Sequence, residues 1–126
     1  MVKLDHVTIP VSDWMRSRDW YVRNLGFSFE FELPEGGREG RGVVALQDDS
    51  GLTLFMEQLS GPIHCGQAMY AFQVDDVEAL HVRLAGEGQS FRAPPGKQYW
   101  GYGAVLSDPD GHVLNLWDPH STAEKR

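Results

Sequence analysis

The chain has 126 residues, of which 41% are hydrophobic, and its formal net charge is −7 at pH 7. This length and composition predict one domain with a packed core. The acidic balance and the lack of a basic patch exclude nucleic acid and anionic membranes as expected partners, and no apolar run is long enough to span a bilayer.

The first half of the chain predicts one strand, one helix and three further strands. Alternation of side chains predicts a strand over residues 2–11, and Pro10 indicates its edge or end because proline cannot donate a ladder hydrogen bond. Ser12 or Asp13 can cap the following helix, and Gly26 can end it because glycine tolerates positive φ. The remaining strands are expected over residues 27–33, 43–47 and 52–59.

The second half predicts the same order of elements. A strand over residues 68–74 precedes a helix that Asp75 or Asp76 can cap and that Gly86 and Gly88 can end. The later segments are a short strand over 90–93, a loop over 94–103, strands over 104–107 and 113–118, and a polar tail over 120–126 that we expect to fray.

Two pairs of segments indicate that the chain is an internal duplication. Residues 6–13 and 69–76 are both strand-like runs that lead into a helix cap, and they lie 63 residues apart. Residues 48–56 and 108–116 are both a turn followed by an alternating strand, and they lie 60 residues apart. Two such half-domains can form one site between them, in which equivalent positions face each other.

With these elements in place, the chain resembles the vicinal oxygen chelate superfamily. This superfamily includes glyoxalase I, bleomycin-resistance proteins, fosfomycin-resistance enzymes and extradiol dioxygenases. The segments that carry the resemblance are Leu4–Val7, Trp20–Phe27, Phe72–Val77 and Ser107–His112.

The resemblance implies an α+β fold made of two βαβββ modules whose curled mixed sheets enclose a cleft. We expect one domain over residues 1–126, with modules at about residues 3–59 and 68–118. It also implies a homodimer. The single cysteine, Cys65, excludes an intrachain disulfide, and with no signal-peptide pattern at Met1 it fits a cytoplasmic protein. The role of Cys65 stays open.

Metal-using members of this superfamily carry their ligands on the first and fourth strands of each module. The resemblance therefore implies that His6 stands at a ligand position, and the repeat makes Met69 its counterpart, where metal-using relatives usually have histidine. Asn115 stands where those relatives usually have glutamate, and its repeat partner is Phe55. Glu57 lies two residues further along, on the same side of the strand, and could substitute for Phe55.

This set of donors is poor for Zn, Ni, Mn or Fe, which need three or four His, Cys or carboxylate ligands. Met69 offers a soft thioether and Asn115 an uncharged amide. We therefore expect no metal cofactor and an apolar cavity that Phe55 and Met69 line. The alternative is a divalent metal held by His6 and Glu57, with a partner chain supplying another ligand.

An aromatic run, Tyr99-Trp100-Gly101-Tyr102, lies in the segment that approaches the cleft in the superfamily. Aromatic faces beside glycine can stack on a flat organic ligand, although such a loop can also pack its rings onto its own module. The residues expected to line the cleft are His6, Phe55, Glu57, Met69, Trp100, Tyr102 and Asn115.

Three functions are compatible with these residues. The favoured function is metal-independent binding of a small organic molecule. The second is a metal-dependent lyase or dioxygenase of the glyoxalase or dioxygenase type, in which the metal polarises substrate oxygens. The third is an enzyme that uses His6 as a general base with Asn115 or Tyr70 as a hydrogen-bond donor. Whether the protein is an enzyme stays open.

Overall fold

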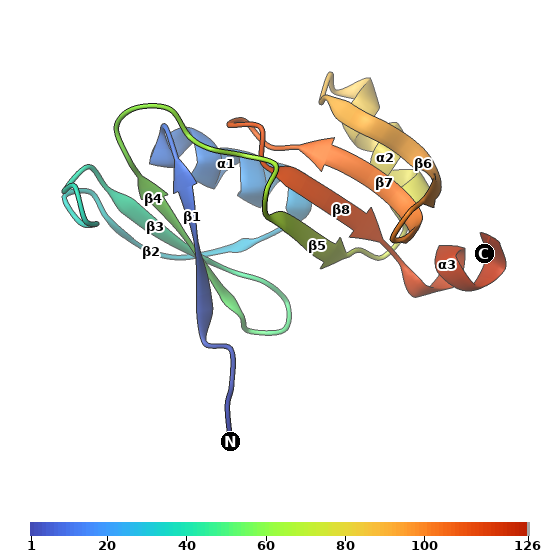
Figure 1. Cartoon of the computed structure of the whole chain (residues 1–126), viewed down its shortest axis with the longest axis horizontal. Coiled ribbons are helices and arrows are strands. Elements are labelled where there is room, and N and C mark those ends of the chain that lie inside the picture. Colours follow the sequence, from blue (N-terminus) through green and yellow to red (C-terminus); the bar gives the residue numbers. More distant parts are fainter. Residues whose placement is uncertain (126) are drawn as a thin grey trace. The chain divides into compact units, whose positions relative to one another are not determined.

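A computed structural model describes residues 1–125, and its contacts divide the chain into two compact units, Met1–His64 and Cys65–Arg126. The first unit contains β1 (His6–Val11), α1 (Trp14–Leu25), β2 (Ser28–Leu33), β3 (Val43–Gln47) and β4 (Thr53–Gln58). The second contains β5 (Met69–Gln73), α2 (Val77–Gly86), β6 (Phe91–Gln98), β7 (Gly101–Ser107), β8 (Val113–Trp117) and α3 (Pro119–Lys125) (Figure 1). The α+β class and the repeated βαβββ order are confirmed.

Each unit forms one four-stranded mixed sheet, and the two sheets share a topology. The strand orders are β1-β4-β3-β2 and β5-β8-β7-β6, so the first strand of each module pairs in parallel with its last. His6 is aligned with Thr53 in the first sheet, and Met69 with Val113 in the second. The register therefore preserves both offsets of the sequence repeat.

The main helix of each module leaves one face of its sheet uncovered. In the first unit α1 packs against β3 and β4, and fully buried side chains such as Leu46 and Met56 point toward it. In the second unit α2 packs against β6 and β7, above Leu106 and Leu116. Since side chains alternate along a strand, their neighbours point to the uncovered face. That face carries His6, Phe55 and Glu57 in one unit and Met69, Asn115 and Trp117 in the other.

An aspartate starts each main helix at the position that the repeat predicts. Asp13 accepts a hydrogen bond from the backbone N–H of Arg16 at 3.1 Å, and Asp76 accepts one from Ala79 at 3.0 Å. Gly26 ends α1 with a φ of 74°. Of the two candidate residues for each cap, the second is therefore the one used.

The expected loop over residues 94–103 was wrong, because this segment is mostly strand. β6 runs through Pro94 and Pro95, and only Tyr99 and Trp100 separate it from β7. β6 is an edge strand whose register shifts between Ala93 and Gly96, so the prolines need not donate ladder hydrogen bonds. The aromatic run therefore forms the tip of a hairpin.

The expectation of a fraying tail was also wrong, because residues 119–125 form α3. Asp118 accepts a hydrogen bond from the N–H of Ser121 at 2.6 Å, and Pro119 has a fixed φ that suits the first helical position. Arg126, the last residue of that tail, lies outside the described residues. None of the helices formed by residues 1–125 is long and apolar enough to cross a membrane.

Asp118 joins the starts of two helices. Its second carboxylate oxygen accepts a hydrogen bond from the N–H of Val77, the first residue of α2, at 2.7 Å. The side chain is 1% exposed. Burial opposes ionisation, but the N–H groups of Ser121 and Val77 together outweigh it and lower the pKa of Asp118. One buried carboxylate therefore fixes α2 and α3 beside the last strand.

We expect Asp118→Ala to lower the free energy of unfolding by about 2–4 kcal/mol, since backbone N–H groups at the starts of two helices, each bond contributing roughly 1–2 kcal/mol, lose their acceptor together. Urea unfolding at pH 7 measures this loss, and Asp76→Ala, which removes one exposed cap, should cost less. The pKa of Asp118 is lower in the folded chain than in the unfolded chain. Its carboxylate therefore contributes its full stabilisation at pH values above the unfolded pKa, and this stabilisation disappears as the pH falls through the folded pKa. Equal losses for the two variants would contradict the role of Asp118 at the starts of both helices.

Candidate functional site

The uncovered face of the first sheet carries an aromatic cluster around Phe55. The ring of His6 meets Phe55 edge-on with centroids 4.8 Å apart, and Phe31 of β2 meets it at 5.9 Å. The His6 Nδ1 atom lies 2.9 Å from a carboxylate oxygen of Asp5. The structure thus brings the candidates His6 and Phe55 together, although Phe55 lies two ladder positions beyond Thr53, the residue aligned with the histidine.

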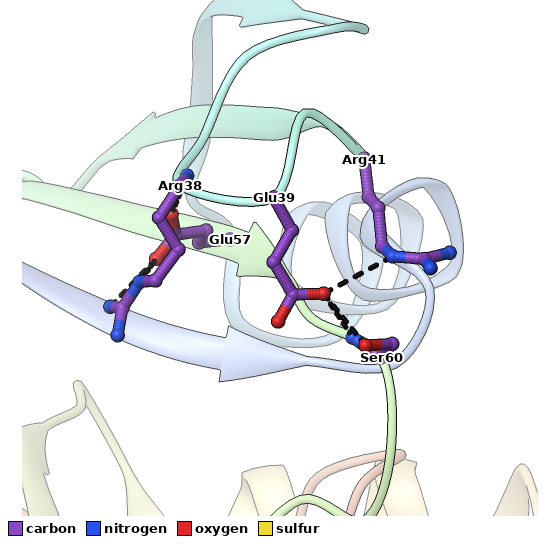
Figure 2. A network of polar contacts seen from close by, with 5 residues as sticks. All are labelled: Arg38, Glu39, Arg41, Glu57 and Ser60. Carbon is purple, nitrogen blue, oxygen red and sulfur yellow. Dashed lines mark hydrogen bonds and ion pairs between the residues drawn. The ribbon is translucent and has the colours of Figure 1, made fainter.

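Glu57 lies on the same face, and its carboxylate is paired with Arg38 in the loop between β2 and β3. The backbone N–H of Arg38 donates to one carboxylate oxygen at 2.6 Å, and the guanidinium group donates to the other at 2.8 and 3.0 Å (Figure 2). The backbone hydrogen bond, helped by the guanidinium group, lowers the pKa of Glu57 against the opposing effect of burial. Both oxygens of this buried carboxylate therefore already have partners.

The loop that supplies Arg38 is fixed on two sides. Gly37 has a φ of 91°, and a Cβ atom there would lie 3.1 Å from an oxygen of Glu57, so the close approach favours glycine. On the other side, Glu39 accepts hydrogen bonds from the N–H of Ser60 at 2.8 Å and from Arg41 at 3.1 Å (Figure 2). The pairing of Arg38 with Glu57 was missed from the sequence, where the only signal was an acid at a buried strand position, which needs a partner.

These donors do not fit a divalent metal ion. Along the β1–β4 ladder His6 aligns with Thr53, four positions from Glu57, which corresponds to about 13 Å along the strands. Zinc-type ligands must all come within about 2.0–2.3 Å of the ion. Among residues 1–125, no three His, Cys, Asp or Glu side chains gather as a metal site requires.

The second unit contains a pocket of about 370 Å³. This volume lies within the range of small-molecule sites. Its walls are formed by Ala71, Trp100, Gly101, Tyr102, Asn115, Trp117 and Thr122. Three of these were candidates from the sequence, and every wall residue is uncharged. Such walls can stack on a ring and form hydrogen bonds, but they place no acid–base pair beside a ligand.

Trp100 is held in the pocket wall by the hairpin that carries it. A Cβ atom on Gly103 would run into the Trp100 ring and the carbonyl oxygen of Leu116, so the indole rests on bare backbone. Beside it, the Tyr99 hydroxyl donates to the Met69 sulfur on β5 at 3.1 Å. The hairpin tip is therefore attached to the opposite edge of the sheet, near the candidate Met69.

Tyr102 lines the pocket, and its hydroxyl group is hydrogen-bonded to a residue that is not part of the pocket wall. That hydroxyl donates to the carboxylate of Glu78 on α2, which raises the pKa of Tyr102 to about 12. The Lys125 ammonium lies 5.8 Å from the centre of the Tyr102 ring. Tyr102 is thus a wall residue that also connects β7 to both helices, and its phenol stays protonated at neutral pH.

Comparison with known proteins identifies a family model and a relative in Escherichia coli that each match most of the chain. The family model described as "Glyoxalase/Bleomycin resistance protein/Dioxygenase superfamily" matches residues 3–116. The chain is 29% identical over 125 residues to "Uncharacterized protein YaeR" of Escherichia coli strain K12, covering 92% of this chain and 95% of that protein.

Two solved structures from Streptomyces sp. CB03234 are also similar. One is TnmS3, described as an antibiotic binding protein, with a TM-score of 0.77 and 26% identity over 94% of this chain and 97% of that one. The other is described as a glyoxalase/bleomycin resistance protein, with a TM-score of 0.69 and 27% identity over 90% of this chain and 98% of that one.

We expect Glu57→Gln to lower the free energy of unfolding at pH 7 by about 1–3 kcal/mol, because the carboxylate that accepts hydrogen bonds from the charged Arg38 becomes a neutral amide with only one acceptor oxygen. The folded pKa of Glu57 lies below its unfolded value, so this contribution is present above the unfolded pKa and is lost as pH falls through the folded one. Urea unfolding measured across this pH range should show that the stability difference between the native chain and Glu57→Gln becomes smaller as the pH falls. The exposed Glu35→Gln should change stability by less than about 0.5 kcal/mol, and an equal effect at both positions would rule out the proposed role of Glu57.

Proposed function

Since the chain belongs to the glyoxalase/bleomycin resistance protein/dioxygenase superfamily, we propose that it binds a small, flat organic molecule without a divalent metal centre. The observation that carries this proposal is the pocket of the second unit, whose wall contains Trp100, Trp117 and the buried side chain of Asn115. Aromatic walls with few polar groups are typical of small-molecule sites.

The chemistry of the expected ligand positions supports a metal-free site. Glu57 is neutralised by Arg38, and a metal ion would have to replace three hydrogen bonds to capture that carboxylate. Met69 and Asn115 contribute no negative charge to balance a divalent cation.

Similarity to TnmS3 adds support of another kind, because that protein is described as binding an antibiotic, which is an organic molecule. The net charge of −7 favours a neutral or cationic ligand over an anionic one. The ligand we propose is therefore a neutral or cationic aromatic compound.

The first test is the metal content of protein purified without added ions. We expect Zn, Ni, Mn and Fe, measured by mass spectrometry of the acid-digested protein, to remain far below one equivalent. We also expect His6→Ala to leave these values unchanged. Near-stoichiometric metal that disappears in His6→Ala would overturn the metal-free proposal in favour of a metal-dependent enzyme.

The second test is the affinity for acridine, a flat and neutral probe at pH 8, followed through tryptophan fluorescence. We expect Trp100→Ala to weaken binding about tenfold, since stacking on one aromatic side chain contributes roughly 1–3 kcal/mol. Trp20→Ala, a matched change in α1 of the other unit, should keep the affinity of the native chain. Unchanged acridine affinity in Trp100→Ala would exclude the aromatic pocket as the binding site.

A further inference from the structure

The side chain of Asn115 is buried at the pocket without satisfying its hydrogen-bonding groups. It is 6% exposed, and within residues 1–125 the contact of its amide group is to the Met69 sulfur, 3.9 Å from Nδ2. A thioether is a weak acceptor, and no donor reaches the amide oxygen in the part of the chain that the structure describes. The amide oxygen is not among the fully enclosed side-chain atoms that lack a partner in the described residues, so it stays accessible, and a molecule in the pocket can complete its hydrogen bonds.

The surroundings of Asn115 leave space on the pocket side for a molecule that could form hydrogen bonds with its amide group. Its neighbours across the ladder are Val105 on β7 and Ala71 on β5, and the methyl group of Ala71 fills little volume on the pocket side. Trp117 lies two residues along the same face of β8, and Trp100 approaches from the hairpin tip. The amide therefore shares the pocket wall with two indole rings, and a flat ring stacked on either indole could present its edge to the amide.

We infer that this pocket takes an uncharged planar heterocycle with a lactam edge, and that Asn115 pairs with that edge. The inference rests on the proposed function. A carboxamide offers one donor and one acceptor in a plane, and a lactam offers the complementary acceptor and donor side by side, as a base edge does toward asparagine. None of the wall residues is charged, so an ionic edge would lose its hydration without compensation.

A matched pair of probes tests this inference directly. 2-Quinolone carries the N–H and C=O of a lactam, whereas N-methyl-2-quinolone keeps the ring and the C=O but loses the donor. The chain has four tryptophans, so ¹⁵N-labelled indole signals locate binding. We expect the signals of Trp100 and Trp117 to shift, those of Trp14 and Trp20 to stay, and 2-quinolone to bind about 10 to 100 times more tightly.

Two variants distinguish hydrogen bonding by the Asn115 amide from a change in the shape of the pocket. In Asn115→Leu the preference for 2-quinolone over its N-methyl derivative should fall to about one. In Asn115→Asp the preferred probe should become protonated 2-aminoquinoline, whose two N–H donors match a carboxylate. Melting curves establish that each variant is folded.

The possible results distinguish the inference from the function on which it rests. If both quinolones shift the pocket tryptophans and bind equally to the native chain, the lactam inference is overturned while the aromatic pocket stands. If neither probe shifts Trp100 or Trp117 at millimolar concentration, both the inference and the proposed function are overturned. An unchanged probe preference in Asn115→Asp would also overturn the pairing.

Discussion

Parallel pairing of the first and last strands of each module determines where its chemically useful residues lie. This pairing places His6 beside the strand of Phe55, and Met69 beside the strand of Asn115, although each pair is about fifty residues apart along the chain. Because the helix covers one face of the sheet, strand alternation sends all four of these side chains to the other face. A one-residue slip in either ladder would bury them against the helix and expose the core.

The two modules use this shared framework for different chemistry. In the first, the uncovered face is occupied by its own groups: rings pack around Phe55, and Arg38 satisfies the Glu57 carboxylate. In the second, the hairpin tip leaves a pocket whose buried amide lacks a strong partner within the described residues. Duplication has therefore kept the register of the strands while the residues on the uncovered face have diverged in chemistry.

Local signals in the sequence were sufficient for much of the fold. The caps Asp13 and Asp76 and the faces of β1 and β8 follow from hydrogen-bonding chemistry and from a period of two. The strand through Pro94 and Pro95 could not be predicted in this way, because an edge position and a shifted register become visible only in the assembled sheet. The hydrogen bonding of Arg38 to Glu57 depends on a loop conformation in which Gly37 has a positive φ. The spacing of charged residues in the sequence does not encode this conformation.

The contact between Trp100 and Gly103 limits how this pocket can change during evolution. At Gly103 any side chain would meet both the indole and the backbone of the neighbouring strand, so this wall cannot be adjusted by substitution without moving the strand. Ala71 and Thr122 are small wall residues whose replacement alters volume while leaving that backbone in place. Related chains that accept larger or smaller ligands would thus differ at these two positions before they differ at the glycine.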